Sequence, residues 1–237
     1  MKILIVVLLG MVIIVSGIMI GCDELVGSGN LETKEYTFND FTKVEIGSAF
    51  KFDISQSDSY GISITADDNV MEDVRVTKSG DTLKIDVRTT GPLRSVTLEA
   101  TVTMPKLHDL EVSGASRGTI SGFESNEDFN IDVSGASKVS GDITAGNTYF
   151  DVSGASTLEL EGTAGDMEAD VSGASHFYLE DFSVNDADVN MSGASSGTVN
   201  VNEILDVDLS GASNLKYVGT PRMGDINTSG ASSLSKK

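Results

Sequence analysis

The segment FNIDVSGASKVSGDITAGNTYFDVSGAS, residues 129–156, contains the five letters VSGAS twice. The shorter string SGAS occurs seven times in the chain, beginning at Ser113, Ser134, Ser153, Ser172, Ser192, Ser210 and Ser229. Successive copies therefore begin 21, 19, 19, 20, 18 and 19 residues apart. Self-similarity at a short, nearly fixed period indicates a repeat protein in which each unit packs mainly against its neighbours.

The residues before each SGAS alternate between apolar and polar. The third position before it is always apolar: Leu110, Ile131, Phe150, Ala169, Val189, Val207 and Ile226. The second position before it is always Glu, Asp or Asn, and the first is apolar in six copies of seven. This period of two predicts a strand with one buried face. A second short alternation follows SGAS, as in Leu158 and Leu160. The glycine of SGAS, which lies between the two alternating segments, permits a tight corner.

A unit of about 20 residues with two or three short strands predicts one coil of a parallel β-helix. We therefore expect an all-β fold with right-handed winding, about 19–20 residues per coil, and SGAS coils over residues 111–237. Propeller blades need about 40 residues, and leucine-rich repeats need an asparagine ladder that is not seen here. With coils ~4.8 Å apart, the six intervals predict a column of roughly 29 Å.

The two ends of the repeat region differ. Residues 32–110 also alternate, with a hairpin signal at Ser79-Gly80-Asp81, and are expected to form a β-rich cap on the first coil. The last coil is expected to be incomplete, so that Lys236 and Lys237 would blunt an open sheet edge. That open coil is also the surface at which a homo-oligomer would form.

The N-terminus has the pattern of an export signal. Lys2 is followed by eighteen uncharged residues and then by Gly-Cys-Asp-Glu, where MIGC resembles the bacterial lipobox with Met19 in place of the usual leucine. We expect a signal peptide over residues 1–21, a lipidated Cys22 and a spacer over 22–31. The alternative is an uncleaved membrane anchor. Both predict an exported body held at the cell membrane or surface.

The chain has 36 acidic and 16 basic residues and a net charge of −20, which argues against nucleic-acid partners. In stacked coils the acids fall above one another: Asp132, Asp151 and Asp170 in one column, and Glu168, Asp188, Asp206 and Asp225 in the other. Hard cations such as calcium prefer carboxylate oxygens, so these columns predict weak cation binding. The alternative is a solvated face, since the enclosing loop of a strong calcium site is missing from the pattern.

Little in the sequence indicates catalysis. His108 and His176 fall in different coils without a neighbouring cysteine, which argues against a zinc site, and no cofactor is predicted. The SGAS serines have no histidine at a fixed spacing, and the chain has no tryptophan to stack on sugars. We therefore expect a protein that is not an enzyme. An enzyme acting on envelope polysaccharide and a structural or signalling partner of another membrane protein remain alternatives.

Three features of the sequence are typical of one known family. They are the SGAS corners, the segment VTMPKLHDLEVSGAS over residues 102–116, and the spaced phenylalanines, valine and glycine over 38–47. With these motifs the chain resembles the GIN-domain family, which is described as the head domain of an auto-transporter adhesin. The resemblance implies a β-helical exported domain, often on lipoproteins, without assigned catalytic residues or a known ligand. The sequence thus predicts a non-enzymatic, lipid-anchored envelope protein for adhesion or envelope contacts, with an unknown surface ligand.

Overall fold

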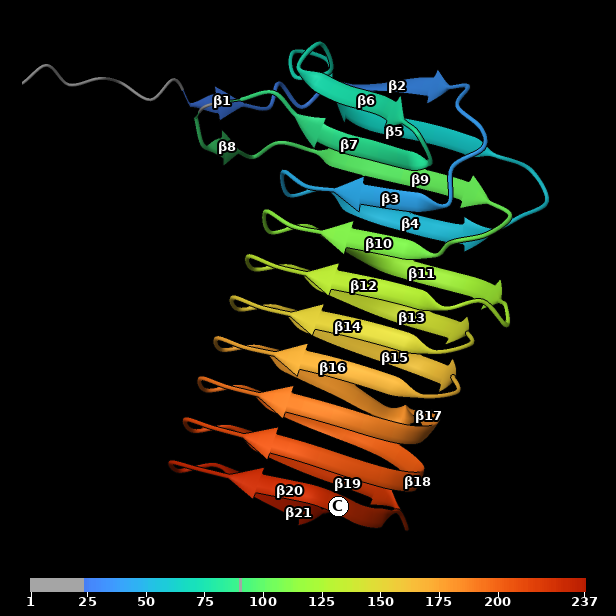
Figure 1. Cartoon of the computed structure of the whole chain (residues 1–237). Helices are drawn as coiled ribbons and strands as arrows, with labels where there is room; N and C mark the ends of the chain where they lie inside the picture. Colours follow the sequence, from blue (N-terminus) through green and yellow to red (C-terminus); the bar gives the residue numbers. More distant parts are fainter. Residues whose placement is uncertain (1–23, 90) are drawn as a thin grey trace, which may run out of the picture.

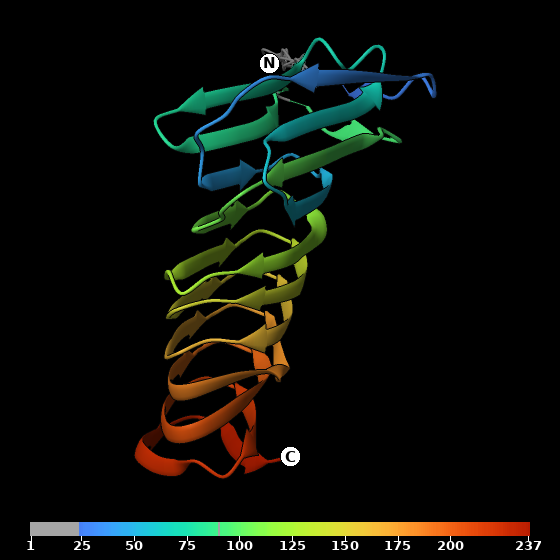
Figure 2. The same cartoon turned by 90° about the vertical axis from the view of Figure 1, so that its right-hand side faces the viewer.

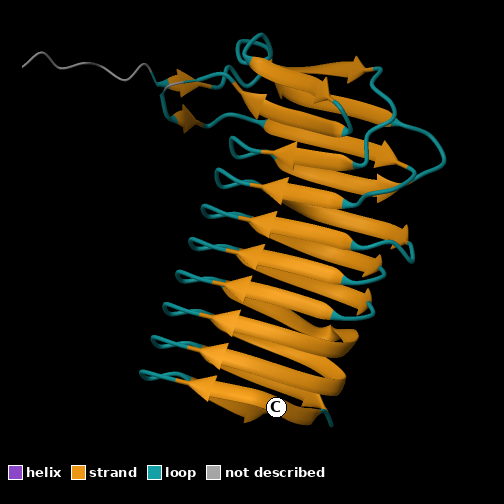
Figure 3. Cartoon of the chain, viewed as in Figure 1, coloured by secondary structure: helices purple, strands orange, loops and turns teal. Residues whose placement is uncertain are grey.

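The computed structural model describes residues 24–89 and 91–237, and every regular element within them is a β-strand (Figure 3). The predicted signal peptide and Cys22 lie outside the described residues. Among the described residues, no helix is long and apolar enough to cross a membrane.

The strands wind into a column of coils, in which each coil adds one strand to a front sheet and one to a back sheet (Figures 1 and 2). The front sheet consists, in spatial order, of β7 (Thr82–Val87), β3 (Lys43–Ile46), β10 (Asp109–Val112), β12 (Phe129–Val133), β14 (Thr148–Val152), β16 (Met167–Val171), the second halves of β17 (His176–Met191) and β18 (Ser196–Leu209), and β20 (Arg222–Thr228).

The back sheet consists of β9 (Leu98–Met104), β4 (Lys51–Gln56), β11 (Arg117–Glu124), β13 (Lys138–Thr144), β15 (Thr157–Thr163), the first halves of β17 and β18, β19 (Asn214–Gly219) and β21 (Ser233–Lys236). All of these neighbours pair in parallel, as expected for a β-helix, and the coils wind in the right-handed sense (Figure 1).

The inward positions align as the repeat predicts. Val112 pairs with Val133, which pairs in turn with Val152 and then with Val171. All four side chains are at most 2% exposed. Burial of each such side chain contributes about 1.5–3 kcal/mol, which outweighs the repulsion between neighbouring surface carboxylates, about 1 kcal/mol per pair in water. The predicted single file of apolar residues, and with it the β-helix, is confirmed.

The SGAS corners lie along one side of the column, at the left in Figure 1. Gly154 has a φ of 76° and Gly173 one of 76°, in the left-handed region that glycine favours. Their backbones stack closely, because Ala174 N donates a 2.8 Å hydrogen bond to Gly154 O in the preceding coil. A β-carbon on Gly173 would lie 3.1 Å from both the carbonyl carbon and the nitrogen of Gly154, and nearer still to its oxygen. Stacking therefore requires glycine here for space as well as for conformation.

The N-terminal region adds two coils that no SGAS marks. The coil formed by β3 and β4 lies between the β7–β9 coil and the β10–β11 coil, so the order along the chain differs from the order in space. Beyond them, β5 (Gly61–Asp67) and β2 (Leu31–Tyr36) extend the back sheet in antiparallel fashion, and β6 (Val74–Ser79) extends the front sheet. The expected cap is confirmed, and the hairpin at Gly80 joins β6 to β7.

The segment before β2 is bound to this cap. Its strand β1 (Leu25–Val26) pairs with β8 (Leu93–Arg94). Asp67 is 1% exposed, and its carboxylate accepts hydrogen bonds from Gly29 N at 2.6 Å and Thr97 N at 2.7 Å. The residues expected to be a spacer therefore make specific contacts from Glu24 onwards.

Candidate functional site

The outer face of the front sheet carries the predicted acidic columns. Asp132 pairs with Asp151, which pairs with Asp170. In the second column Glu168 pairs with Asp188, which pairs with Asp206. Asp225 meets this column through a bulge, where its backbone nitrogen donates a 2.6 Å hydrogen bond to the carboxylate of Asp206. The paired carboxylates therefore stack in the columns expected from the repeat, whereas the bulge beside Asp225 was not expected.

Crowding on this face changes the acidity of its groups. Partial burial, followed by the charges of neighbouring carboxylates, raises the pKa of Asp132, Asp151 and Asp188 above the ordinary aspartate value. Tyr149 donates a 3.0 Å hydrogen bond to Asp170, and this bond is the largest cause that raises the pKa of Tyr149 to about 12. The face therefore favours species that neutralise negative charge.

A strong metal centre needs several ligands around one point. Among the described residues, no group of three or more histidines, cysteines or carboxylates has such an arrangement. The carboxylates instead form flat columns, which provide neighbouring oxygens on one side only. Weak cation binding by these residues stays a prediction.

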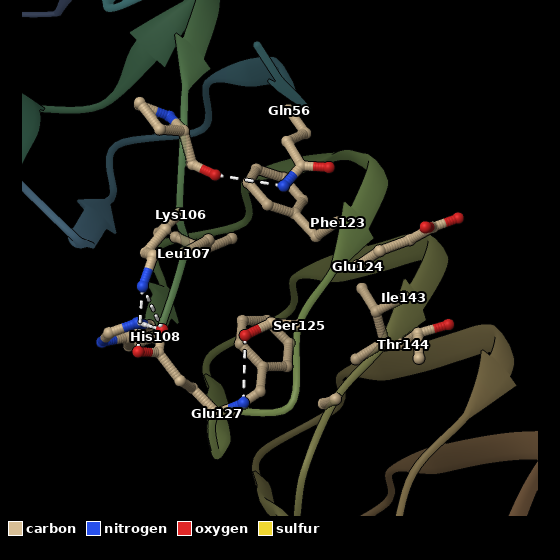
Figure 4. Close-up of a pocket in the computed structure, with 13 residues that line it drawn as sticks. Gln56, Lys106, Leu107, His108, Phe123, Glu124, Ser125, Glu127, Ile143 and Thr144 are labelled. Carbon is tan, nitrogen blue, oxygen red and sulfur yellow. Dashed lines mark hydrogen bonds and ion pairs between the residues drawn. The ribbon is translucent and has the colours of Figure 1, made fainter. Parts of the chain in front are cut away.

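A small pocket lies on the opposite side from the SGAS corners, where the turn after β11 meets the segment that leads from β9 to β10 (Figure 4). Its volume is about 110 Å³, and its apolar lining includes Leu107, Phe123, Phe129 and Ile143. The turn is long because the interval between Ser113 and Ser134 has 21 residues, more than any other interval.

An ionic cluster borders this pocket (Figure 4). Lys106 Nζ lies 2.9 Å from each carboxylate oxygen of Glu127, and His108 Nε2 lies 2.7 Å from Oε2 of the same residue. The hydrogen bond from Lys106, and then that from His108, lowers the pKa of Glu127. The glutamate is thus a stable anion between two nitrogen groups, an arrangement that fixes the turn and leaves no free base.

His176 and two of the corner serines are also engaged. His176 Nδ1 lies 2.8 Å from Ser196 Oγ, and its ring stacks on Tyr178 at 5.9 Å between centroids. Of the corner serines, Ser195 donates to Ser192 O at 2.6 Å and Ser213 to Ser210 O at 2.7 Å. These hydroxyls close the corner turns and do not face a histidine. Sequence reasoning did not identify the contact between His108 and Glu127, because it depends on how two loops meet.

The coils, corners and cap define the class of protein, a two-sheeted β-solenoid. The family model "Putative auto-transporter adhesin, head GIN domain" matches residues 40–221, and the chain belongs to this family. No curated protein sequence matches the chain.

Solved structures share the fold. A protein of Bacteroides fragilis described as a "putative adhesin" matches with a TM-score of 0.84 at 21% identity, covering 90% of this chain and 100% of that one. One of Parabacteroides merdae, described in the same words, gives 0.70 at 17% identity, with 91% and 99% covered. One of Parabacteroides distasonis, described as a "putative lipid binding protein", gives 0.66 at 20% identity, with 90% and 99% covered. At these identities the likeness shows the fold.

Proposed function

We propose that this protein is a non-enzymatic, lipid-anchored β-solenoid that holds a binding surface away from the cell membrane for adhesion or envelope contacts. The adhesin descriptions of its family and of two structural relatives support this function. The absence of a converging catalytic group among the described residues is compatible with it.

The observation that carries the proposal is the docking of the N-terminal segment on the cap. Leu25 and Val26 pair with β8, so the described chain starts at the capped end of the column. Two peptide steps separate Cys22 from Glu24, which span about 7 Å at most. A lipid on Cys22 would therefore hold the cap close to the bilayer. The nine coils of the described chain would extend from there over about 38 Å.

The pocket of Figure 4 does not suggest a different role for this chain. One structural relative is described as a "putative lipid binding protein". Pockets for drug-sized ligands measure about 300–1,000 Å³, whereas this pocket measures about 110 Å³. It is too small to enclose an acyl chain, so display of an outer surface is the better-supported function.

Two measurements test the proposal. Mass spectrometry of the N-terminal peptide from bacterial membranes should find a diacylated cysteine at position 22, and Cys22→Ala should remove this mass. An unmodified N-terminus that begins at Met1 would instead support the uncleaved anchor. Purified residues 24–237 should then bind a subset of an array of glycans and matrix proteins, and hydrolysis of any polysaccharide on the array would contradict the non-enzymatic role.

A further inference from the structure

A groove of about 500 Å³ crosses the outer face of the back sheet. It lies over β9, β4, β11 and β13, the strands of the first four coils, whose order along the column can be followed in Figure 1. Its rims are two columns of outward side chains. One column contains Glu99, Lys51, Arg117 and Lys138. The other contains Thr101, Asp53, Thr119 and Ser140. This volume is within the range of small-ligand sites.

The first column collects positive charge on a strongly acidic protein. Lys51, Arg117 and Lys138 occupy consecutive coils, ~4.8 Å apart. The two lysines turn away from the centre, because Lys51 pairs with Glu99 at 3.3 Å and Lys138 with Glu159 at 3.1 Å. Within the described part of the chain, no carboxylate lies at ion-pair distance from Arg117. The central guanidinium is therefore the cation that remains for an anion.

The second column supplies groups that bind hydroxyls. Thr119 Oγ1 donates a 2.8 Å hydrogen bond to Asp53 Oδ2. The remaining lone pairs of this carboxylate can accept hydrogen bonds, and the hydroxyls of Thr101 and Ser140 can donate or accept them. A guanidinium facing a carboxylate and several hydroxyls suits a ligand that carries both an anionic group and hydroxyls.

We propose that this groove binds an anionic saccharide, with the carboxylate or sulfate of the sugar on Arg117 and its hydroxyls on Asp53 and Thr119. The inference rests on the proposed function, for which it names a ligand class. Guanidinium matches planar carboxylate and tetrahedral sulfate through paired hydrogen bonds. Because Glu99 and Glu159 neutralise the lysines on either side, Arg117 alone among the described groove residues offers a free positive charge, so the site suits a short segment of two or three sugar units with one anionic group.

The acidic front sheet explains why such a ligand would be confined to this place. Its carboxylate columns, which include Asp132 and Asp151, repel anions along the rest of the solenoid. On the back sheet, the cation column ends at Lys138 and continues with Thr157 and His176 in the next two coils. Three neighbouring cations thus occur at one place, together with the groove.

The test uses residues 24–237, which include every described contact of the solenoid. The probes are a sulfated chondroitin disaccharide, its unsulfated uronate counterpart and neutral lactose. Each is titrated to about 10 mM while the amide chemical shifts of the protein are recorded by NMR, a range in which millimolar affinity is detectable. Both anionic sugars should shift amides of β4, β11 and β13, and lactose should not. A shift by the sulfated sugar alone would assign the site to sulfate, and a shift by both would assign it to either anion.

Two variants test whether Arg117 binds the anionic group of the sugar. Arg117→Gln should weaken anionic sugar binding by about 10- to 100-fold, the range expected for hydrogen bonds to a charged group. Arg117→Lys should recover part of the affinity. The matched control Lys216→Gln removes an exposed cation from the same sheet face in β19, and binding should be unchanged.

Several outcomes would overturn the groove assignment. They are no shift with either anionic sugar, equal binding by wild type and Arg117→Gln, or an equal loss in Lys216→Gln, which would indicate general charge attraction. If the array finds a neutral glycan or protein ligand that is insensitive to Arg117→Gln, the proposed function stands and the groove proposal fails. Circular dichroism confirms that each variant is folded. If Arg117→Gln does not fold, Arg117→Lys is the substitute, and its binding should be weaker than that of the wild type and stronger than that of a variant without a cation at this position.

Discussion

Two glycine variants can separate the steric cost of a β-carbon at a stacked SGAS corner from the cost of placing alanine in a left-handed backbone conformation. Gly173 and Gly80 both have a positive φ, 76° and 60°. A β-carbon on Gly80 meets no heavy atom within 4 Å, whereas one on Gly173 would press on the backbone of Gly154 in the preceding coil. The substitutions Gly173→Ala and Gly80→Ala therefore share the conformational cost, and only the first adds a steric one.

The magnitudes follow from these contacts. Alanine in the left-handed region costs about 1–2 kcal/mol, less about 0.4–1 kcal/mol because the unfolded chain loses freedom, so Gly80→Ala should cost about 1 kcal/mol. In Gly173→Ala the corner must also shift, which adds about 1–3 kcal/mol of overpacking. The hydrogen bonds from Ala174 N to Gly154 O, 2.8 Å, and from Ala194 N to Gly173 O, 2.7 Å, weaken by about 1 kcal/mol together. The total is about 3–5 kcal/mol.

Thermal unfolding followed by circular dichroism measures this difference. At roughly 2–4 °C per kcal/mol for a chain of this size, the melting temperature should fall by roughly 10 °C in Gly173→Ala and by roughly 3 °C in Gly80→Ala. Because coils can unfold in groups, amide hydrogen exchange should also show faster exchange at Ala174 and Ala194. Equal losses in the two variants would refute the argument, since they would mean that the corner backbones are not in contact.

Three further predictions concern single side chains. Asp151→Asn should raise the unfolding free energy at pH 7 by about 0.5–1 kcal/mol, since two neighbouring carboxylates repel Asp151 and salt screens part of the effect. Burial and neighbouring charge raise the folded-state pKa of Asp151, so the repulsion is present above that pKa and lost below it. The gain should therefore vanish by about pH 3 in chemical denaturation series, and a gain that persists there would contradict the charge explanation. Ser195→Ala should cost about 1–2 kcal/mol because the hydroxyl donates to a corner carbonyl, whereas Ser137→Ala should cost under about 0.5 kcal/mol, as the hydroxyl of Ser137 has no hydrogen-bond partner among the described residues. The two serine variants are compared by thermal melting, and equal costs would refute the assignment. Asp67→Asn should cost about 2 kcal/mol and speed hydrogen exchange at the two backbone amides bound to the carboxylate; unchanged exchange would show that the N-terminal segment is held by other contacts.

The repeat region was predictable because one local pattern is used many times. Each strand before SGAS alternates, so the buried positions of Val133, Val152 and Val171 follow from the sequence alone. Once the copies are superposed, the acidic columns follow as well. The pattern encodes which residues of neighbouring coils pair with each other, and the nearly constant period preserves this pairing register from one coil to the next.

The first two coils were not predictable in the same way. The turn between β3 and β4 reads Gly47-Ser48-Ala49-Phe50, a corner in which Ser48 and Ala49, and not glycine, have φ angles of 62° and 64°. This corner stacks on the SGAS glycine Gly114, yet its letters do not match the repeat. The pairing of β3 with both β7 and β10 also depends on contacts between distant segments, which local alternation does not encode.

The same reasoning indicates where specificity resides in a solenoid. A column of identical residues satisfies the stacking of every coil, but it offers the same surface at each level and cannot define one position along the axis. Position is defined only where the columns change identity. The back-sheet column changes from Glu99 through Lys51, Arg117 and Lys138 to Thr157 within five coils. If the groove proposal holds, the later SGAS coils act as a spacer. The groove itself spans the two coils without SGAS and the first two SGAS coils, where the charge of the column changes.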